Sequence, residues 1–179
     1  QLVFPVYALG ISFSCAGTEL ALSRCVAQEN AAGHPEKAKE LLKTGLIFTF
    51  VLSCILTIFL QHNAHMTAIS FLHDSRCEEL LILLSYTFPF ASIHSCICGY
   101  SLGLKQTKIP AVSQLFEQTF RILFVFLFCY YRTSHQLDLS ISFAVVGLAM
   151  GEIFASCYCL YSIHHTASKQ VQNLLSAST

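Results

Sequence analysis

The stretch AVSQLFEQTFRILFVFLFCYY, Ala111 to Tyr131, is about as long as a membrane crossing and ends in an uninterrupted apolar run. Its first half nevertheless carries two amide and two charged side chains, which we call the polar stripe: Gln114, Glu117, Gln118 and Arg121. Their spacing of three and four residues places them on one face of an α-helix. The opposite side is apolar and consists of Leu115, Phe116, Phe120 and Leu123. The stretch therefore predicts a membrane helix with one polar face.

Four further hydrophobic runs have the length of a crossing, which takes about 20 residues. They are residues 2–27, 44–62, 80–104 and 140–164. The runs 44–62 and 80–104 contain no Asp, Glu, Lys or Arg, so neither offers the polar face that a soluble helix needs. The chain is 54% hydrophobic and only 11% charged, whereas soluble domains carry about a quarter charged residues. We expect an all-α, polytopic membrane bundle with five transmembrane helices.

The linkers between these runs predict an orientation. The segment 28–43 contains three lysines, and two more lie between the third and fourth runs, at Lys105 and Lys108. The other two linkers hold one basic residue each, Arg76 and Arg132. Cytoplasmic loops are rich in Lys and Arg, so 28–43 is expected to be a cytoplasmic loop. Within it, HPEKAKELLK predicts a short amphipathic helix on the cytoplasmic surface.

Several function classes find no support in the sequence. Ten basic and ten acidic residues cancel, so no basic surplus indicates nucleic acid. No glycine-rich stretch ends in Gly-Lys-Ser or Gly-Lys-Thr, so the phosphate-binding loop of ATP-hydrolysing proteins is absent from the sequence. We expect no enzyme activity and no cofactor. Because the chain begins with Gln1 rather than Met, we expect it to be part of a longer protein.

The nine cysteines predict core packing rather than disulfides or a metal site. All except Cys77 lie inside or at the ends of apolar runs, whereas disulfide scaffolds place cysteines in loops. The pairs Cys96–Cys98 and Cys157–Cys159 are two residues apart and thus point to opposed sides of a helix. His62 and His65 could share a face, but no further ligand is evident beside them. We therefore expect no metal.

Two pairs of glycines predict close helix contacts. They are Gly99–Gly103 and Gly147–Gly151, with the four-residue spacing that lets membrane helices approach closely.

The charges inside the runs are the strongest functional signal, because a charge at the bilayer centre costs about 2.5–3.5 kcal/mol. Glu117 and Arg121 are four residues apart and can pair, which lowers that cost. The stripe either lies in the cytoplasmic headgroup region or lines a water-filled cavity that opens to the cytoplasm. Arg121 lies about 16 Å along a helix that starts at Pro110, which favours the cavity.

Two more carboxyl groups lie within apolar runs. Glu19 belongs to a small, polar edge of the first run, formed by Ser12, Cys15, Ala16, Glu19 and Ser23, whereas Arg24 points elsewhere. Glu152 lies in the middle of the last run. Each is either an ion-handling, proton-handling or headgroup-binding group, or a structural carboxyl that is protonated or hydrogen-bonded.

Two longer segments, LALSRCVAQENAAGHPEKAKELLKTG and GYSLGLKQTKIPAVSQLFEQTFRI, resemble motifs of the stage V sporulation protein B group of polysaccharide biosynthesis flippases. This group belongs to the superfamily of multidrug, oligosaccharidyl-lipid and polysaccharide exporters. The family's motif residues correspond here to Ser23, Arg24, Gln114, Glu117, Gln118 and Arg121. The chain departs from the pattern at Glu19, Gln28 and Leu102, where Pro, Glu and Gln are usual.

The resemblance implies a fold of two lobes, each of about six helices, around a central cavity. Residues 1–179 would be the second to sixth helices of the first lobe, and the second lobe would be a partner within the same chain. The implied function is alternating-access transport of a lipid-linked oligosaccharide or peptidoglycan precursor across the bacterial cell membrane. Arg24 and the polar stripe would bind this substrate among the membrane lipids.

Two alternatives remain open from the sequence. A cation-coupled exporter of drugs and toxins would use Glu19 or Glu152 to bind a proton or sodium ion. A non-transporting membrane scaffold for envelope or spore assembly would not need charges in mid-membrane.

Overall fold

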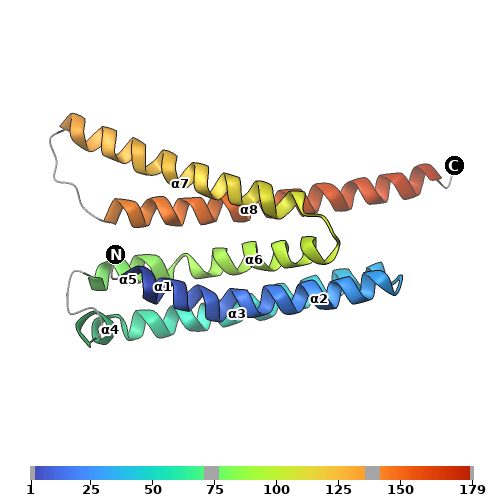
Figure 1. The fold of residues 1–179 in the computed structure, drawn as a ribbon, viewed down its shortest axis with the longest axis horizontal. Helices are drawn as coiled ribbons and strands as arrows, with labels where there is room; N and C mark the ends of the chain where they lie inside the picture. Colours follow the sequence, from blue (N-terminus) through green and yellow to red (C-terminus); the bar gives the residue numbers. More distant parts are fainter. Residues whose placement is uncertain (1–2, 71–76, 136–141, 178–179) are drawn as a thin grey trace.

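The chain is all-α in the part that the structure describes (Figure 1). The computed structural model describes residues 3–70, 77–135 and 142–177. The elements are α1 (Val3–Ile11), the π-helix η1 (Ser12–Ala16), α2 (Gly17–Ala31), α3 (Pro35–His62), α4 (Ala64–Ser70), α5 (Cys77–Ser85), α6 (Phe88–Gly103), α7 (Lys108–His135) and α8 (Ser142–Ala177). Residues 1–2, Arg76 and 140–141, which take part in the expectations above, lie outside the described residues. The predicted all-α membrane bundle is confirmed.

Helix α6 is the central element of the bundle. It packs against α2 and α3 on one side and against α8 on the other, while α7 packs mainly on α8 (Figure 1). The elements α1, η1 and α2 follow one another directly, so Val3 to Ala31 is helical throughout. The two sides of the molecule therefore meet at α6, and side chains of α6 can reach both.

The polarity of α3 is the reverse of that of a helix in a soluble protein. Its buried side carries hydroxyl groups: Ser53 Oγ lies 3.1 Å from Ser92 Oγ, and Thr57 Oγ1 donates to the carbonyl oxygens of Ser53 and Ser85. Its exposed side is apolar and includes Ile47, Phe48, Val51, Ile55, Ile58 and Phe59. Small polar residues between helices and large apolar residues outside are typical of membrane helices, so this side of α3 faces lipid.

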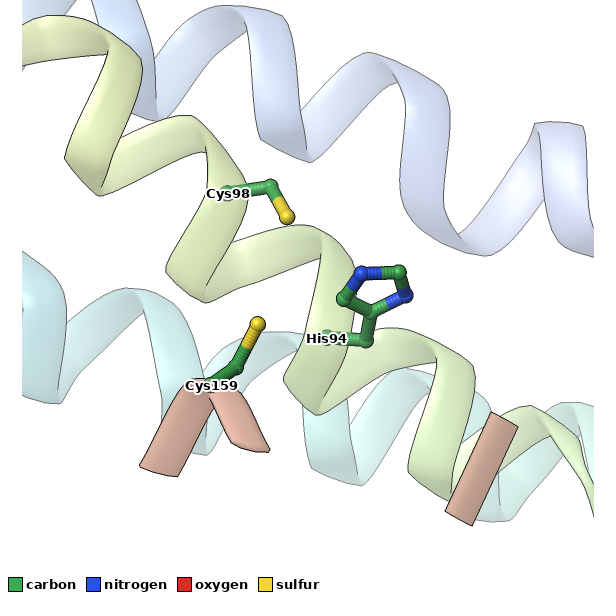
Figure 2. A group of neighbouring side chains, drawn as sticks. All are labelled: His94, Cys98 and Cys159. Atoms are coloured by element: carbon green, nitrogen blue, oxygen red, sulfur yellow. The ribbon is translucent and has the colours of Figure 1, made fainter. Parts of the chain in front are cut away.

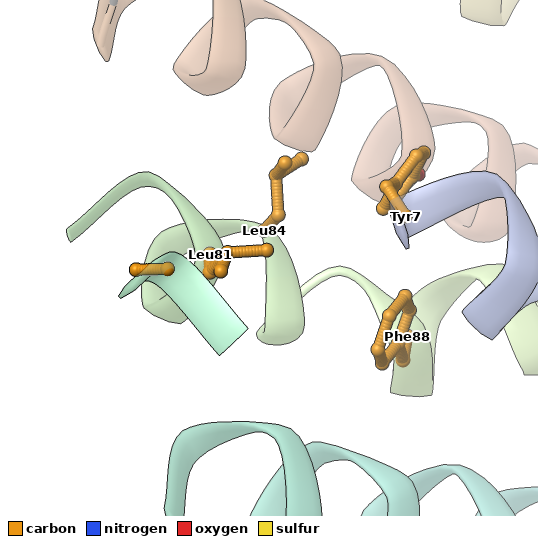
Figure 3. Close-up of a cluster of buried hydrophobic side chains, with 5 residues drawn as sticks. Tyr7, Leu81, Leu84 and Phe88 are labelled. Carbon is orange, nitrogen blue, oxygen red and sulfur yellow. The ribbon is translucent and has the colours of Figure 1, made fainter. Parts of the chain in front are cut away.

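The segment between α5 and α6 breaks the hydrophobic run 80–104. The axes of the two helices differ in direction by 41°. Pro89 stands at the start of α6, where its missing N–H removes no helical bond, and the Thr87 hydroxyl donates to the Leu84 carbonyl at 2.7 Å. The ring of Phe88 stacks on that of Tyr7 with centroids 5.8 Å apart (Figure 3). Helix α1 thus packs directly on the break.

Three described helical segments are long and apolar enough to cross a membrane: Pro35–His62, Lys108–Tyr131 and Val145–Ile163. The bent pair Glu78–Ser85 and Phe88–Gly103 makes a fourth if it is one span. The expected span 2–27 is not among these, because η1 divides it. The π-turn separates the nine-residue α1 from α2, which carries Glu19, Arg24 and Glu29.

The predicted surface helix at residues 34–43 is wrong as a separate element. The structure instead has one helix, α3, from Pro35 to His62. Ala38 and Leu42 are buried against Leu22 and Val26 of α2, so the apolar face of this segment packs on protein. Because no proline follows Pro35 in the segment, the helix continues into the apolar part without a break.

Both glycine pairs lie at helix contacts, as the sequence predicted. Gly99 and Gly103 face α2, and a Cβ atom at Gly103 would lie 2.8 Å from the carbonyl oxygen of Ser23. Gly147 and Gly151 face α7, and a Cβ atom at Gly151 would lie 2.9 Å from the carbonyl oxygen of Glu117. Backbone atoms cannot give way as side chains do, so even alanine separates the helices at these positions.

We therefore expect Gly103→Ala or Gly151→Ala to destabilise the folded protein by about 1–3 kcal/mol, the usual cost of overpacking. Gly17→Ala is the matched control, because Gly17 is helical and a Cβ atom added there would meet nothing within 4 Å. Thermal unfolding in detergent measures the difference. Equal melting temperatures for Gly103→Ala and Gly17→Ala would show that the α2–α6 contact is not tight.

Candidate functional site

The polar stripe of α7 is divided between the inside and the outside of the bundle. Glu117 and Arg121 form an ion pair, with 13% and 28% of their side chains exposed. Gln114 and Gln118 are exposed, and Gln118 Oε1 accepts a hydrogen bond of 3.4 Å from an Arg121 guanidinium nitrogen. The predicted pairing of Glu117 with Arg121 is confirmed. The stripe therefore has an inner, charged half and an outer, amide half.

The apolar residues on the other side of α7 differ in how far they are buried. Phe120 stacks on Phe154 of α8 with ring centroids 4.2 Å apart, and Phe116 contacts Tyr158. Leu115, in contrast, is 67% exposed. Helix α8 thus partly covers Phe120, whereas Phe116 and Leu115 belong to the exposed apolar residues of α7.

Glu152 of α8 is buried beside the ion pair. Its Oε2 atom lies 3.6 Å from Nδ1 of His94 on α6. His94, Glu117 and Glu152 each offer one ligand atom within 4.8 Å of the others'. The other ring nitrogen of His94, Nε2, lies 3.0 Å from the hydroxyl oxygen of Ser113. Helices α6, α7 and α8 therefore meet at a buried group of two carboxyls, an imidazole and a guanidinium, which we call the interior cluster.

The charges of the interior cluster balance only with an added proton. Glu117 and Arg121 neutralise each other, which leaves the carboxylate of Glu152 with the imidazole of His94. One proton on either group makes this second pair neutral overall, and a neutral pair is favoured where water is excluded. The cluster therefore places two carboxyls, an imidazole and a guanidinium at an interface between three helices.

Two polar atoms of the interior cluster are buried without a hydrogen-bond partner. They are Arg121 Nε and Glu152 Oε2, the two such side-chain atoms found among the described residues. Buried polar atoms in folded proteins almost always have partners, because an unmade hydrogen bond costs about 1–3 kcal/mol. One donor and one acceptor are thus available here to a ligand or an ion.

Glu19 and Arg24 lie elsewhere, on α2. Glu19 Oε2 accepts a hydrogen bond of 2.9 Å from Ser95, the residue after His94 on α6. The same Ser95 hydroxyl lies 3.3 Å from the carbonyl oxygen of Cys15 in the π-helix. Arg24 is exposed. Helix α2 packs on α6 and α3, so the structure brings Glu117, Arg121 and Glu152 together but places Glu19 and Arg24 apart from them.

The sequence alone did not single out His94 of the interior cluster or its neighbour Ser113. An imidazole in an otherwise uncharged hydrophobic run was the available signal for His94, since ionisable residues in such runs are rare. Ser113 precedes the stripe by one residue and carried no signal of its own.

The long apolar helices and the interior cluster together indicate a multi-pass membrane protein with ionisable groups inside its helix bundle. Residues 1–127 match the family model described as MatE, and the chain belongs to this family. It is similar to "Stage V sporulation protein B" of Bacillus subtilis (strain 168), with 28% identity over 158 residues. That match covers 88% of this chain but 30% of the relative's length. No solved structure matches the chain.

Proposed function

We propose that the protein transports a lipid-linked oligosaccharide or peptidoglycan precursor across the bacterial cytoplasmic membrane by alternating access. The observation that carries the proposal is the Glu117–Arg121 pair, a partly exposed ion pair that lies beside the exposed amides of Gln114 and Gln118 in a largely apolar helix. Family membership and the similarity to a sporulation protein of Bacillus subtilis support a membrane transport role.

The polar stripe suits a cargo with a phosphate and a sugar. A guanidinium donates parallel hydrogen bonds to phosphate oxygens, and the Arg121 side chain stays 28% exposed beside its bonds to Glu117 and Gln118. The exposed amides of Gln114 and Gln118 can bond sugar hydroxyls, and the lipid tail of the cargo stays among the exposed apolar residues. In this proposal a second lobe of the same chain faces the stripe across the cavity, and Arg24 binds phosphate at the membrane surface.

An ion gradient or the membrane potential supplies the energy in this proposal. The His94–Glu152 pair takes up or releases the coupling proton, because it is neutral with one added proton and lies next to the ion pair that binds cargo. Glu19, held by Ser95 on the neighbouring side of α6, is a second candidate for a proton or sodium ion.

The interior cluster also favours a second candidate, a cation-coupled exporter of drugs and toxins. Such a protein needs buried carboxyls that exchange a cation with each transport cycle, and Glu117 and Glu152 with His94 meet this need. It does not need the exposed amides of Gln114 and Gln118 beside a guanidinium.

Transport assays on the full-length protein in vesicles separate the two candidates. We expect vesicles with the protein to move a fluorescent lipid-linked oligosaccharide between leaflets faster than vesicles without it, and Gln114→Ala with Gln118→Ala to slow this movement. A protein that leaves the lipid-linked sugar in place but expels a cationic dye when an acid gradient is applied would be a drug exporter, and the first proposal would be wrong.

A further inference from the structure

A second group of buried side chains lies where α6 packs on α8. His94 and Cys98 project from the same face of α6, one turn apart, and Cys159 projects from α8 toward them (Figure 2). Each offers one metal-ligating atom, and these atoms all lie within 4.8 Å of one another. All three residues are buried. We call this group the thiol cluster.

The surroundings of His94 are those of a metal-binding histidine. A histidine that binds a metal through one ring nitrogen usually donates the other N–H to a carboxylate, which fixes the ring and its tautomer. Here Nδ1 lies 3.6 Å from Glu152 Oε2, the buried acceptor that has no hydrogen-bond partner. With the ring and the carboxyl roughly half an ångström closer, a proton on Nδ1 would satisfy this oxygen and leave the lone pair of Nε2 for a metal.

Ser113 of α7 lies beside a nitrogen and a sulfur atom of the thiol cluster. Its hydroxyl oxygen is 3.0 Å from His94 Nε2 and 3.7 Å from Cys98 Sγ. The hydroxyl therefore occupies the side of the imidazole that faces the thiols. It donates its proton to the Pro110 carbonyl oxygen at 2.9 Å, so a lone pair of the hydroxyl oxygen is placed to complete a four-coordinate site.

We propose that His94, Cys98 and Cys159 bind a zinc ion, with Glu152 as the positioning residue behind His94. Zn–S bonds are about 2.3 Å and Zn–N bonds about 2.0–2.1 Å, so donors on a tetrahedral zinc lie about 3.6–3.8 Å apart. The observed upper limit of 4.8 Å exceeds this by roughly 1 Å, a change that side-chain rotation supplies.

The chemistry and the charge of the three ligands favour zinc over other metal ions. Thiolates and imidazole are ligands of zinc and copper, whereas sodium, magnesium and calcium prefer oxygen. Two thiolates cancel the charge of Zn²⁺, and a neutral complex is the one that a buried position between membrane helices tolerates. Cu⁺ with the same ligands would leave a net negative charge there.

Binding releases two protons. The S–H bonds of Cys98 and Cys159 break as two S–Zn bonds form, and His94 coordinates through its lone pair without losing a proton. The bound ion joins α6 to α8, and it holds the His94 ring against Glu152. The proposed zinc site shares His94 and Glu152 with the interior cluster, but its ligand atoms include neither carboxyl, and the proposal does not depend on transport.

The test uses the full-length protein, purified in detergent with its affinity tag removed. We expect one zinc per chain by elemental analysis. After chelation, Co²⁺ should give the near-ultraviolet thiolate-to-cobalt absorption band and the visible bands of a tetrahedral ion. Cys98→Ser and Cys159→Ser should each abolish the thiolate band or weaken it with a large loss of affinity. Glu152→Gln should keep the band but lower zinc affinity about tenfold to 100-fold.

Cys96→Ser and Cys157→Ser are the matched controls, because each lies two residues from a proposed ligand on the same helix. Both should bind zinc and cobalt as the unmodified protein does. Thermal unfolding without metal checks that the ligand variants are folded, and Cys159→Ala provides a second variant if Cys159→Ser is not. Zinc content and cobalt spectra that are unchanged in Cys98→Ser and Cys159→Ser would overturn the proposal. So would a Cys98–Cys159 disulfide in place of bound metal by mass spectrometry.

Discussion

Arg121→Ala reduces translocation of a lipid-linked sugar to the background of protein-free vesicles, while membrane insertion and abundance change little. The partly exposed guanidinium is the cationic group of the polar stripe, so its loss removes the charge that the proposed phosphate-bearing cargo needs. The cost to stability stays small because Arg121 is partly exposed and a proton can neutralise the Glu117 carboxylate that remains. The measurement is fluorescent lipid translocation in vesicles that contain equal amounts of each variant.

Three comparison variants test whether the loss of transport is due to the Arg121 guanidinium itself. Glu117→Gln should slow transport less, because glutamine keeps the shape and a hydrogen-bond acceptor for the guanidinium. Arg121→Lys should be intermediate, since lysine keeps the charge but loses the planar fork. Phe120→Ala should lower stability by about 1 kcal/mol or more through its lost stack on Phe154, with little change in transport per folded molecule. Full activity in Arg121→Ala would contradict the proposal. It would mean that the polar stripe lies in the solvated headgroup region and does not bind cargo.

His94→Leu destabilises the folded protein by about 3–5 kcal/mol at neutral pH, the usual cost of removing one partner of a buried charged pair. The imidazole is the neighbour that offsets the buried carboxyl of Glu152, and the apolar leucine provides no donor. Adding Glu152→Met to His94→Leu should recover most of the loss, because a buried pair replaced by apolar residues of similar size is often neutral in stability.

Unfolding in detergent, in the presence of a metal chelator, measures this double-mutant cycle. The chelator removes any contribution of bound metal, so the cycle reports the coupling between the two side chains. A loss in His94→Leu that Glu152→Met does not recover would mean that His94 stabilises the protein through Ser113 or through packing instead.

The helical fold could be predicted largely from hydrophobic runs, because run length and missing polar faces leave few alternatives. Spacing alone indicated that Gly103 and Gly151 lie at close helix contacts, but not that their partners are α2 and α7. The break before α6 and the π-turn in the first run did not follow from spacing, although Pro89 marked the first of them. Both depend on tertiary contacts, such as the stack of Phe88 on Tyr7, that sequence periodicity does not encode.

The candidate site could be predicted only within single helices. Spacing on α7 was enough to pair Glu117 with Arg121, but it could not show that Glu152 of α8 lies beside them. The two-residue spacing of Cys96 and Cys98 places them on opposed sides of α6, whereas His94, one turn from Cys98, lies on the same face as Cys98. The third member of the thiol cluster, Cys159, comes from another helix, and only the packing of α6 on α8 brings it close.

The central claim is that the polar stripe of α7 meets water and cargo while the rest of its outer surface meets lipid. Spin labels on cysteines introduced at Gln118 and at Leu123 test it most directly, in full-length protein whose other cysteines, apart from the thiol cluster, are replaced by serine. Collision rates with a water-soluble nickel complex and with oxygen report the surroundings of each label. We predict that the label at 118 collides mainly with nickel and is shielded when lipid-linked sugar is added, whereas the label at 123 collides mainly with oxygen. Equal, oxygen-dominated collision at both positions would contradict the account.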